Sequence, residues 1–146
     1  MGPFQALVES QTGQIADYLP GFFRRHTNLT KFRNVKMLDG GERSAYGNHP
    51  EAECLTKHIV VYDKFWKHDT KGRDWILSHE LGHWALRAVG LSGIMGIVNL
   101  FGDLPFGNDS SEEAFADCFA SYHLDREVQS KYPDWTTAVE RVIKAN

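Results

Sequence analysis

Cysteine is scarce in this sequence, and it contains no long apolar run. Cys54 and Cys118 are the only two cysteines among 146 residues, which rules out the disulfide framework typical of small secreted domains. The longest apolar stretch, residues 90–101, is broken by Gly93 and Gly96 and is shorter than the roughly 18 apolar residues of a transmembrane helix. The start carries no charged-then-apolar leader. We therefore expect no membrane association, and a protein that is cytoplasmic or delivered by a non-standard secretion route.

An excess of charge of either sign is also missing. Sixteen Lys and Arg stand against 19 Asp and Glu, a formal net charge of −3, and 42% of the residues are hydrophobic. This is the composition of an ordinary globular protein, and it gives no general argument for nucleic acid as a partner. A local basic stretch over residues 24–36 is interpreted as a solvated face. The length suits a single domain over residues 1–146, and we expect a monomer.

The residue patterns predict an α+β layout, with a short β-sheet packed against one central helix and further helices after it. Pro20 and Gly21 are expected to interrupt a helix within the first 25 residues, and Asp39-Gly40-Gly41 signals a turn. The expected strands are residues 32–38 and 58–62, with a loop over 42–56. One helix is expected to start near residues 71–74 and to end at Ala88. An apolar connection over 91–107 follows, and then two helices over 110–126 and 133–144.

One five-residue motif indicates metal chemistry. His79-Glu80-Leu81-Gly82-His83 matches the pattern His-Glu-x-x-His. On a helix the two histidines lie one turn apart, so both imidazoles can reach one zinc ion at about 2.0–2.1 Å. Glu80 is displaced by one residue, which suits taking a proton from a water better than binding the ion. The motif predicts His79 and His83 as metal ligands and Glu80 as the general base of a hydrolase.

The motif is rare enough by chance to carry weight. Seven His and nine Glu in 146 residues give roughly 0.02 chance matches. The alternative is a pair of partly exposed surface histidines. Gly82 projects near the histidine side, where a residue without a side chain would let another element approach. The opposite side of the same helix is apolar: Leu77, Leu81, Trp84 and Ala88.

A catalytic zinc with two histidine ligands needs a third protein ligand. Glu113 and Asp117 lie four residues apart and share one helix face, while Cys118 falls on the apolar face and should be buried. We expect Glu113 to bind the zinc and Asp117 to accept the free N–H of a ligating histidine, which sets its tautomer.

Two alternatives apply to these acids. Glu113 fits a capping box with Ser110, and acids are favoured in a first helical turn. Glu112 could be the ligand in place of Glu113. Glu113 is preferred because Asp109 with Glu112 could supply the cap, and Glu112 has no acid one turn further on.

The string from Glu113 to Asp125, Glu-Ala-Phe-Ala-Asp-Cys-Phe-Ala-Ser-Tyr-His-Leu-Asp, resembles the second motif of gluzincin metallopeptidases. The nearest resemblance is to the catalytic domain of anthrax lethal factor and to the Pro-Pro endopeptidases, with phage-repressor-cleaving zinc peptidases as further possible relatives. It spans about residues 59–143. It implies a zincin-like fold, zinc held by His79, His83 and Glu113, Glu80 as general base and Asp117 beside a ligand.

The sequence departs from that pattern at one position. Such enzymes usually place a tyrosine seven residues before the ligand glutamate to stabilise the developing oxyanion, and here that position is Phe106. Losing one oxyanion donor typically lowers the rate by about 10²–10³. The substitutes that the sequence offers are Tyr46, His49, Tyr122 and His123.

Three functions follow from these observations. The working hypothesis is a zinc-dependent endopeptidase that acts on a peptide or protein, with the strand at 58–62 aligning the peptide if it lies at a sheet edge. The second is a zinc-binding interaction module with weak or no proteolysis. The third is a helical partner-binding domain in which the motif is accidental.

Overall fold

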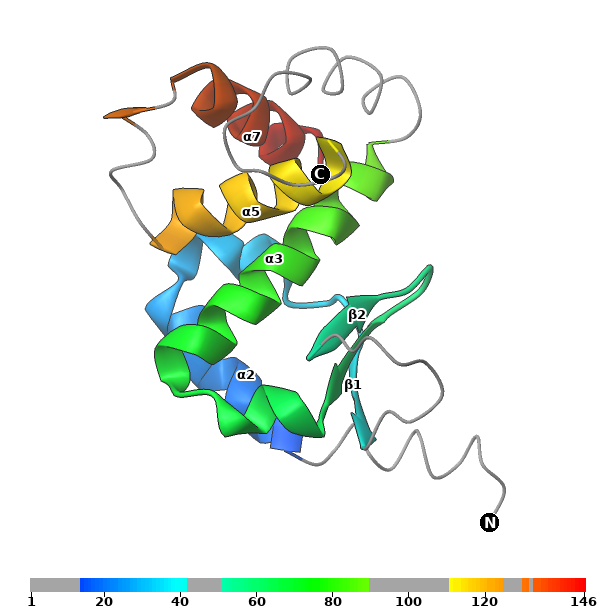
Figure 1. The fold of residues 1–146 in the computed structure, drawn as a ribbon. Helices are drawn as coiled ribbons and strands as arrows, with labels where there is room; N and C mark the ends of the chain where they lie inside the picture. The colour runs from blue at the N-terminus through cyan, green and yellow to red at the C-terminus, as the bar shows by residue number, and fades with distance from the viewer. Residues whose placement is uncertain (1–13, 42–50, 90–110, 125–129, 132) are drawn as a thin grey trace. The chain divides into compact units, whose positions relative to one another are not determined.

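The computed structural model describes residues 14–41, 51–89, 111–124, 130–131 and 133–146. These residues form an α+β arrangement that is mostly helical and includes one three-stranded sheet (Figure 1). The chain divides into two compact units, residues 1–77 and 78–146, and helix α3 (Thr70–Ala88) contributes to both. Within the described ranges, no helix is long and apolar enough to cross a membrane. The single domain over residues 1–146 stays a prediction.

The sheet of the first unit has the strand order β1-β3-β2. β1 (Met37–Gly41) runs parallel to β3 (Ile59–Tyr62), and β2 (Ala52–Cys54) runs antiparallel to β3 on its other side. Three consecutive residues of β3, numbers 59–61, are buried, as expected for a strand covered on both faces. The strand predicted at 58–62 is confirmed. The sequence assigned this strand a role in aligning a peptide only if it lay at a sheet edge, and that condition is not met, because strands on both sides already occupy its backbone hydrogen bonds.

β1 begins later in the chain than predicted. Residues 27–32 form a 3₁₀ helix, η1 (Thr27–Phe32), and the strand includes the Asp39-Gly40-Gly41 segment that was expected to turn. A Cβ on Gly40 would lie 2.5 Å from Cγ1 of Val60 and 2.6 Å from Cε1 of Tyr62. Glycine is therefore required here for the close approach of β3, and strand pairing overrides the local turn preference.

β2 is an element that the sequence pattern missed. It lies inside the segment 42–56 that was interpreted as a loop, and residues 42–50 of that segment lie outside the described residues. Three residues are too few to show a period-2 alternation. Pairing with β3, including Cys54 opposite Ile59, is what makes this segment a strand.

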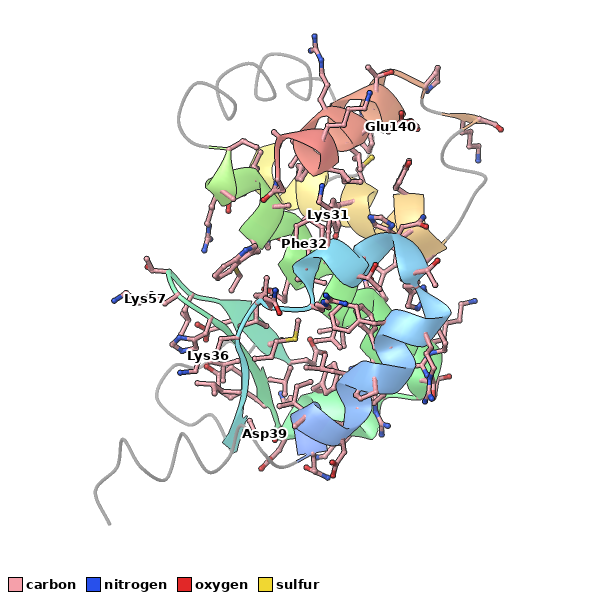
Figure 2. All side chains as sticks on the ribbon, turned by 180° about the vertical axis from the view of Figure 1, so that it is seen from behind. Lys31, Phe32, Lys36, Asp39, Lys57 and Glu140 are labelled. Carbon is pink, nitrogen blue, oxygen red and sulfur yellow. The ribbon has the colours of Figure 1, made fainter. Side chains whose placement is uncertain are left out.

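Helix α2 (Gln14–Arg25) continues through Pro20, against the expected interruption. Pro20 is exposed, so water can bind the carbonyl that loses its helical partner, while Ile15 and Phe22 are buried. The carboxylate of Asp39 accepts a hydrogen bond from the backbone N–H of Ile15 at 3.1 Å, and Figure 2 places Asp39 beside the start of α2. A side chain of β1 thus satisfies a donor in the first turn of α2.

Asp74, in the first part of α3, is the polar centre of the first unit. It is 3% exposed, and its carboxylate receives Nε and Nη2 of Arg25 at 2.8 and 2.9 Å and a further hydrogen bond from the Tyr18 hydroxyl. Nε2 of His26 lies 2.7 Å away. Burial alone would raise the pKa of Asp74, but the hydrogen bonds from Arg25, Tyr18 and His26 outweigh it and lower this pKa. These bonds join α2 to the start of α3.

The described part of the second unit includes residues 78–88 of α3, α5 (Ser111–Leu124) and α7 (Pro133–Ala145). Their predicted positions are confirmed to within two residues, except that residues 125 and 126 lie outside the described part of the chain. Cys118 is fully buried, as expected, whereas Ala88 is exposed and does not belong to the apolar face of α3. The amide of Asn146 donates to the carbonyl of Ala85 at 3.1 Å, which joins the end of α7 to α3. Among the described residues of this unit, the buried apolar ones are Leu81, Ala85, Leu86, Ala114, Phe115, Ala116, Cys118, Phe119, Ala120, Trp135, Ala138, Val139 and Val142.

We expect Asp74→Asn to lower the free energy of unfolding by about 1–3 kcal/mol at pH 7. This loss in the free energy of unfolding is smaller than that for breaking a fully buried ion pair, because the side chain of Arg25 is 39% exposed and water can solvate it in the variant. The folded pKa of Asp74 lies below its unfolded value, so its contribution is present above that unfolded value and is lost as the pH falls through the folded pKa. The difference between variant and wild type should therefore shrink below about pH 4. Urea unfolding across a pH series measures it. Asp17→Asn, exposed on α2, is the matched control, and an equal loss in both variants would contradict the prediction.

Candidate metal centre

The predicted site residues lie on two neighbouring helices of the second unit. His79 and His83 are one turn apart on α3, and Glu113 and Asp117 are one turn apart on α5. Because residues four apart share a helix face, each helix presents a pair of side chains to the other. The structure brings together all four of these residues.

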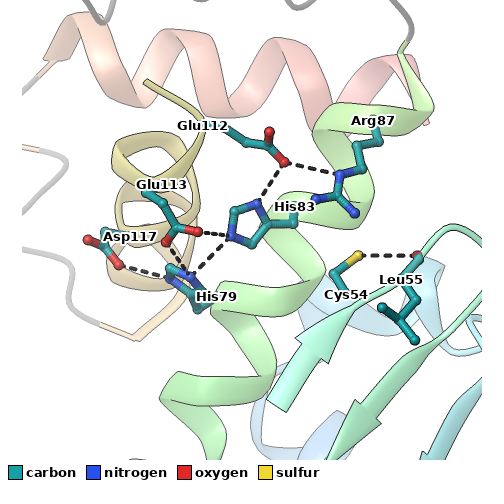
Figure 3. A network of polar contacts seen from close by, with 8 residues as sticks. All are labelled: Cys54, Leu55, His79, His83, Arg87, Glu112, Glu113 and Asp117. Atoms are coloured by element: carbon teal, nitrogen blue, oxygen red, sulfur yellow. Dashed lines mark hydrogen bonds and ion pairs between the residues drawn. The ribbon is translucent and has the colours of Figure 1, made fainter. Parts of the chain in front are cut away.

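The carboxylate of Glu113 contacts both imidazoles (Figure 3). Its Oε2 lies 3.1 Å from Nε2 of His79, and its Oε1 lies 2.9 Å from Nε2 of His83. The two Nε2 atoms are 3.2 Å apart. Three potential ligand groups from two helices thus meet at one point.

This arrangement fits a zinc ion. In a tetrahedral site with ligand bonds of about 2.0–2.1 Å, neighbouring donor atoms are about 3.3–3.4 Å apart. The two Nε2 atoms are 3.2 Å apart, and they lie 3.1 and 2.9 Å from Oε2 and Oε1 of Glu113, so each separation is about 0.1–0.5 Å shorter than that value. Two imidazole nitrogens and a carboxylate oxygen are also a donor set that catalytic zinc uses. The ligand roles themselves stay predictions.

The other ring nitrogen of each histidine also faces a carboxylate. Oδ1 of Asp117 lies 2.8 Å from Nδ1 of His79, in the position that the sequence predicts for it. Oε1 of Glu112 lies 2.9 Å from Nδ1 of His83, and the same oxygen is 3.1 Å from Nε of Arg87. The sequence indicated Glu112 only as a cap or an alternative ligand. Arg87 was not predicted as part of the cluster, although an arginine one turn after His83 shares the face of the histidines.

Glu80 is buried beside the two histidines. Its side chain offers a carboxylate oxygen within 4.8 Å of ligand atoms of both His79 and His83, so these three residues form a group that could hold a metal ion. It is 8% exposed. Burial raises the pKa of Glu80 above its ordinary value, while the neighbouring imidazoles act in the opposite direction. Glu80 and Glu113 are thus both candidate ligands by position, and the sequence predicts Glu113 for that role.

The carboxylates of this cluster favour the protonated forms of the two imidazoles. Burial opposes the charged form of His79, but hydrogen bonds to Asp117 and Glu113 outweigh it and raise the pKa of His79 to about 10. Burial also opposes the charge on His83, and Glu113 likewise raises the pKa of that imidazole. Hydrogen bonds from the two histidines hold the pKa of Glu113 well below its usual range. A divalent cation that bound Nε2 of His79 would have to displace its proton.

Gly82 allows the two helices to come this close. A Cβ at this position would lie 3.0 Å from Cα of Ala116 and 3.0 Å from Cβ of Phe119. The first of these atoms is backbone, so it cannot move without moving α5. The glycine of the motif thus has a structural role: it lets α5 approach α3, as expected from its position beside the histidines.

Neither Tyr122 nor His123 of α5 lies near Glu113, where a substitute for the oxyanion-stabilising tyrosine of gluzincins would be expected. Tyr122 follows Glu113 by nine helical residues, which places it about 180° around the axis and about 13 Å further along it. His123 lies about 15 Å along the same axis from Glu113. Tyr46, His49 and Phe106 lie outside the described residues.

Comparisons of the chain with protein-family models, curated proteins and solved structures found no match. The resemblance to gluzincins therefore rests on the two motifs and the spacing of their residues.

We expect zinc binding to become tighter as the pH rises. Zinc and a proton compete for Nε2 of His79, and the raised pKa of this imidazole keeps it protonated near neutral pH. Displacing one proton should increase the apparent affinity about tenfold for each pH unit between about pH 6.5 and 8.5. Competition with a chelating dye measures this affinity. An affinity independent of pH would contradict the prediction.

We expect Gly82→Val to lower the free energy of unfolding by about 1–3 kcal/mol and to weaken zinc binding, because the added atoms push α5 away from α3. Thermal unfolding of the metal-free protein and zinc titration measure the two effects. Ala88→Val, at an exposed position of the same helix, is the control and should change stability by no more than about 0.5 kcal/mol. Helix propensity alone would favour valine over glycine at position 82 and disfavour valine against alanine at position 88, so a Gly82→Val variant as stable as the wild type would contradict the role of the close approach.

Proposed function

We propose that the chain is a zinc-dependent endopeptidase. The observation that carries this proposal is the convergence of Nε2 of His79 and Nε2 of His83 on both carboxylate oxygens of Glu113. A set of two histidines and one glutamate, with a second glutamate beside the first histidine, is the arrangement expected for metal-assisted hydrolysis.

In this proposal His79, His83 and Glu113 hold the zinc. When bound, the ion would supply a Lewis acid and lower the pKa of a water molecule towards about 7. Glu80 is the general base: it takes a proton from the attacking water and returns it to the leaving nitrogen of the peptide bond. Asp117 accepts the Nδ1–H of His79, at 2.8 Å, and so directs the lone pair of Nε2 towards the metal.

The fold that accompanies this function is zincin-like. The motif helix α3 follows the strands in the chain, and the helix with the third ligand, α5, follows α3. That order of elements, together with the resemblance of the residues from 113 onward to gluzincins, supports the proposal. The substrate is a peptide or a protein, since the resemblance is to peptidases.

A zinc-binding interaction module with weak or no proteolysis is the second candidate. Two observations favour it: Phe106 stands where the related enzymes have a tyrosine, and Tyr122 lies on the opposite face of α5 from Glu113. Both candidates require zinc, and they differ in whether a peptide is cleaved.

Glu80→Gln separates the candidates. The variant should keep close to one zinc per chain, because Glu80 is not a ligand, and hydrolysis of a peptide library should fall by at least about 10²-fold, because no base is left. Elemental analysis and mass spectrometry of the digest measure the two quantities. His79→Ala is the companion variant and should lose the zinc.

Each other outcome has a distinct meaning. Unchanged hydrolysis in Glu80→Gln would exclude this mechanism. Zinc without any cleavage by the wild-type protein would favour the interaction module. A wild-type protein without zinc would exclude both zinc-based candidates and favour the third hypothesis, a helical partner-binding domain.

A further inference from the structure

His83 has polar partners on both sides of its ring, and the partners on the Nδ1 side form a chain of contacts. Nδ1 of His83 lies 2.9 Å from Oε1 of Glu112, and this oxygen lies 3.1 Å from Nε of Arg87 (Figure 3). Arg87 is one turn after His83 on α3. The series of side-chain contacts therefore runs from α3 to Glu112 on α5 and back to α3. The side chain of His83 is 7% exposed, and those of Glu112 and Arg87 are 41% and 47% exposed.

The helix geometry explains why two adjacent acids have different partners. Glu112 and Glu113 are consecutive on α5, so their side chains point about 100° apart around the axis. Glu113 faces the Nε2 atoms of both histidines, and Glu112 faces Nδ1 of His83. The guanidinium of Arg87 holds the Glu112 carboxylate in that direction, away from the point where the Nε2 atoms meet.

The Nδ1 contact determines which nitrogen of His83 is available to a metal. An ionised carboxylate only accepts hydrogen bonds, so Glu112 requires a hydrogen on Nδ1. The lone pair of the neutral ring is then on Nε2. Asp117 has the same effect on His79. Each histidine therefore has an acceptor of its own, and the acceptor of His83 is also in contact with the guanidinium of Arg87.

We propose that Arg87 and Glu112 together act as positioning residues for His83. Glu112 fixes the Nδ1–H tautomer of His83, and Arg87 keeps Glu112 on the Nδ1 side, which leaves Glu113 as the acid that faces the metal. This inference rests on the proposed zinc site. It concerns the affinity and geometry of that site, so it can be tested without any measurement of hydrolysis.

The first measurement is zinc affinity by competition with a chelating dye. Glu112→Ala should bind zinc about 10–100-fold more weakly than the wild type, the range typical of lost partners of metal-binding histidines. Glu112→Gln keeps a carbonyl oxygen that can accept from Nδ1 and should lose less. Arg87→Met keeps the length of the side chain without its charge, and its loss should be in the same direction and smaller than that of Glu112→Ala. Glu140→Gln, at an exposed position of α7, is the control and should bind zinc as the wild type does.

The second measurement detects the tautomer directly. In the zinc-loaded protein, long-range proton–nitrogen NMR spectra should show slowly exchanging Nδ1–H signals for His79 and His83. The signal of His83 should be lost in Glu112→Ala, whereas that of His79 should persist because Asp117 is unchanged. A general loss of stability would affect both signals alike, so the His79 signal is an internal control.

The outcomes separate this inference from the proposed function. If the wild type binds one zinc and Glu112→Ala binds it within twofold of the wild type, with its His83 signal retained, the positioning role is overturned and the zinc site stands. If Arg87→Met binds zinc as the wild type does, the anchoring role of Arg87 is overturned. If the wild type binds no zinc, the proposed function and this inference fall together.

Discussion

The close approach of α3 and α5 at Gly82 is the constraint on which the metal centre depends. With no Cβ at this position, Cα of Ala116 can lie where a larger residue would be forced against it. Side chains as short as histidine and aspartate can then meet across the two helices, with Nδ1 of His79 2.8 Å from Asp117. A wider separation of the helices would place these groups beyond hydrogen-bonding distance.

The cluster between these helices combines strong charges with partial burial. Isolated, the buried imidazoles would favour the neutral form, yet contacts with carboxylates raise the pKa of both histidines. The same contacts lower the pKa of Glu113. Groups of opposite charge packed this closely stabilise one another in the metal-free protein, and the same contacts would hold the donor atoms in place for the proposed zinc ion.

The first unit uses the same physical principle for a different purpose. Asp74 is buried and receives hydrogen bonds from Arg25 and Tyr18, with His26 also in contact, but none of these partners is arranged as a set of metal donors around an open point. The guanidinium of Arg25 carries only donors and cannot bind a cation. This network joins α2 to α3 and has a structural role, whereas the donor set of His79, His83 and Glu113 suits a cation.

Local spacing in the sequence was sufficient for the motif helix, the last helix and the pairing of Glu113 with Asp117, because helical geometry alone places residues four apart on one face. Tertiary contacts decided the rest. Gly40 belongs to a strand because β3 packs against it, β3 is central because β2 covers its second edge, and Glu112 contacts both His83 and Arg87 because α5 lies beside α3. Arg87 and Glu112 are 25 positions apart, and β1 and β3 are separated by 17 intervening residues, so no periodicity within either segment carries information about the other.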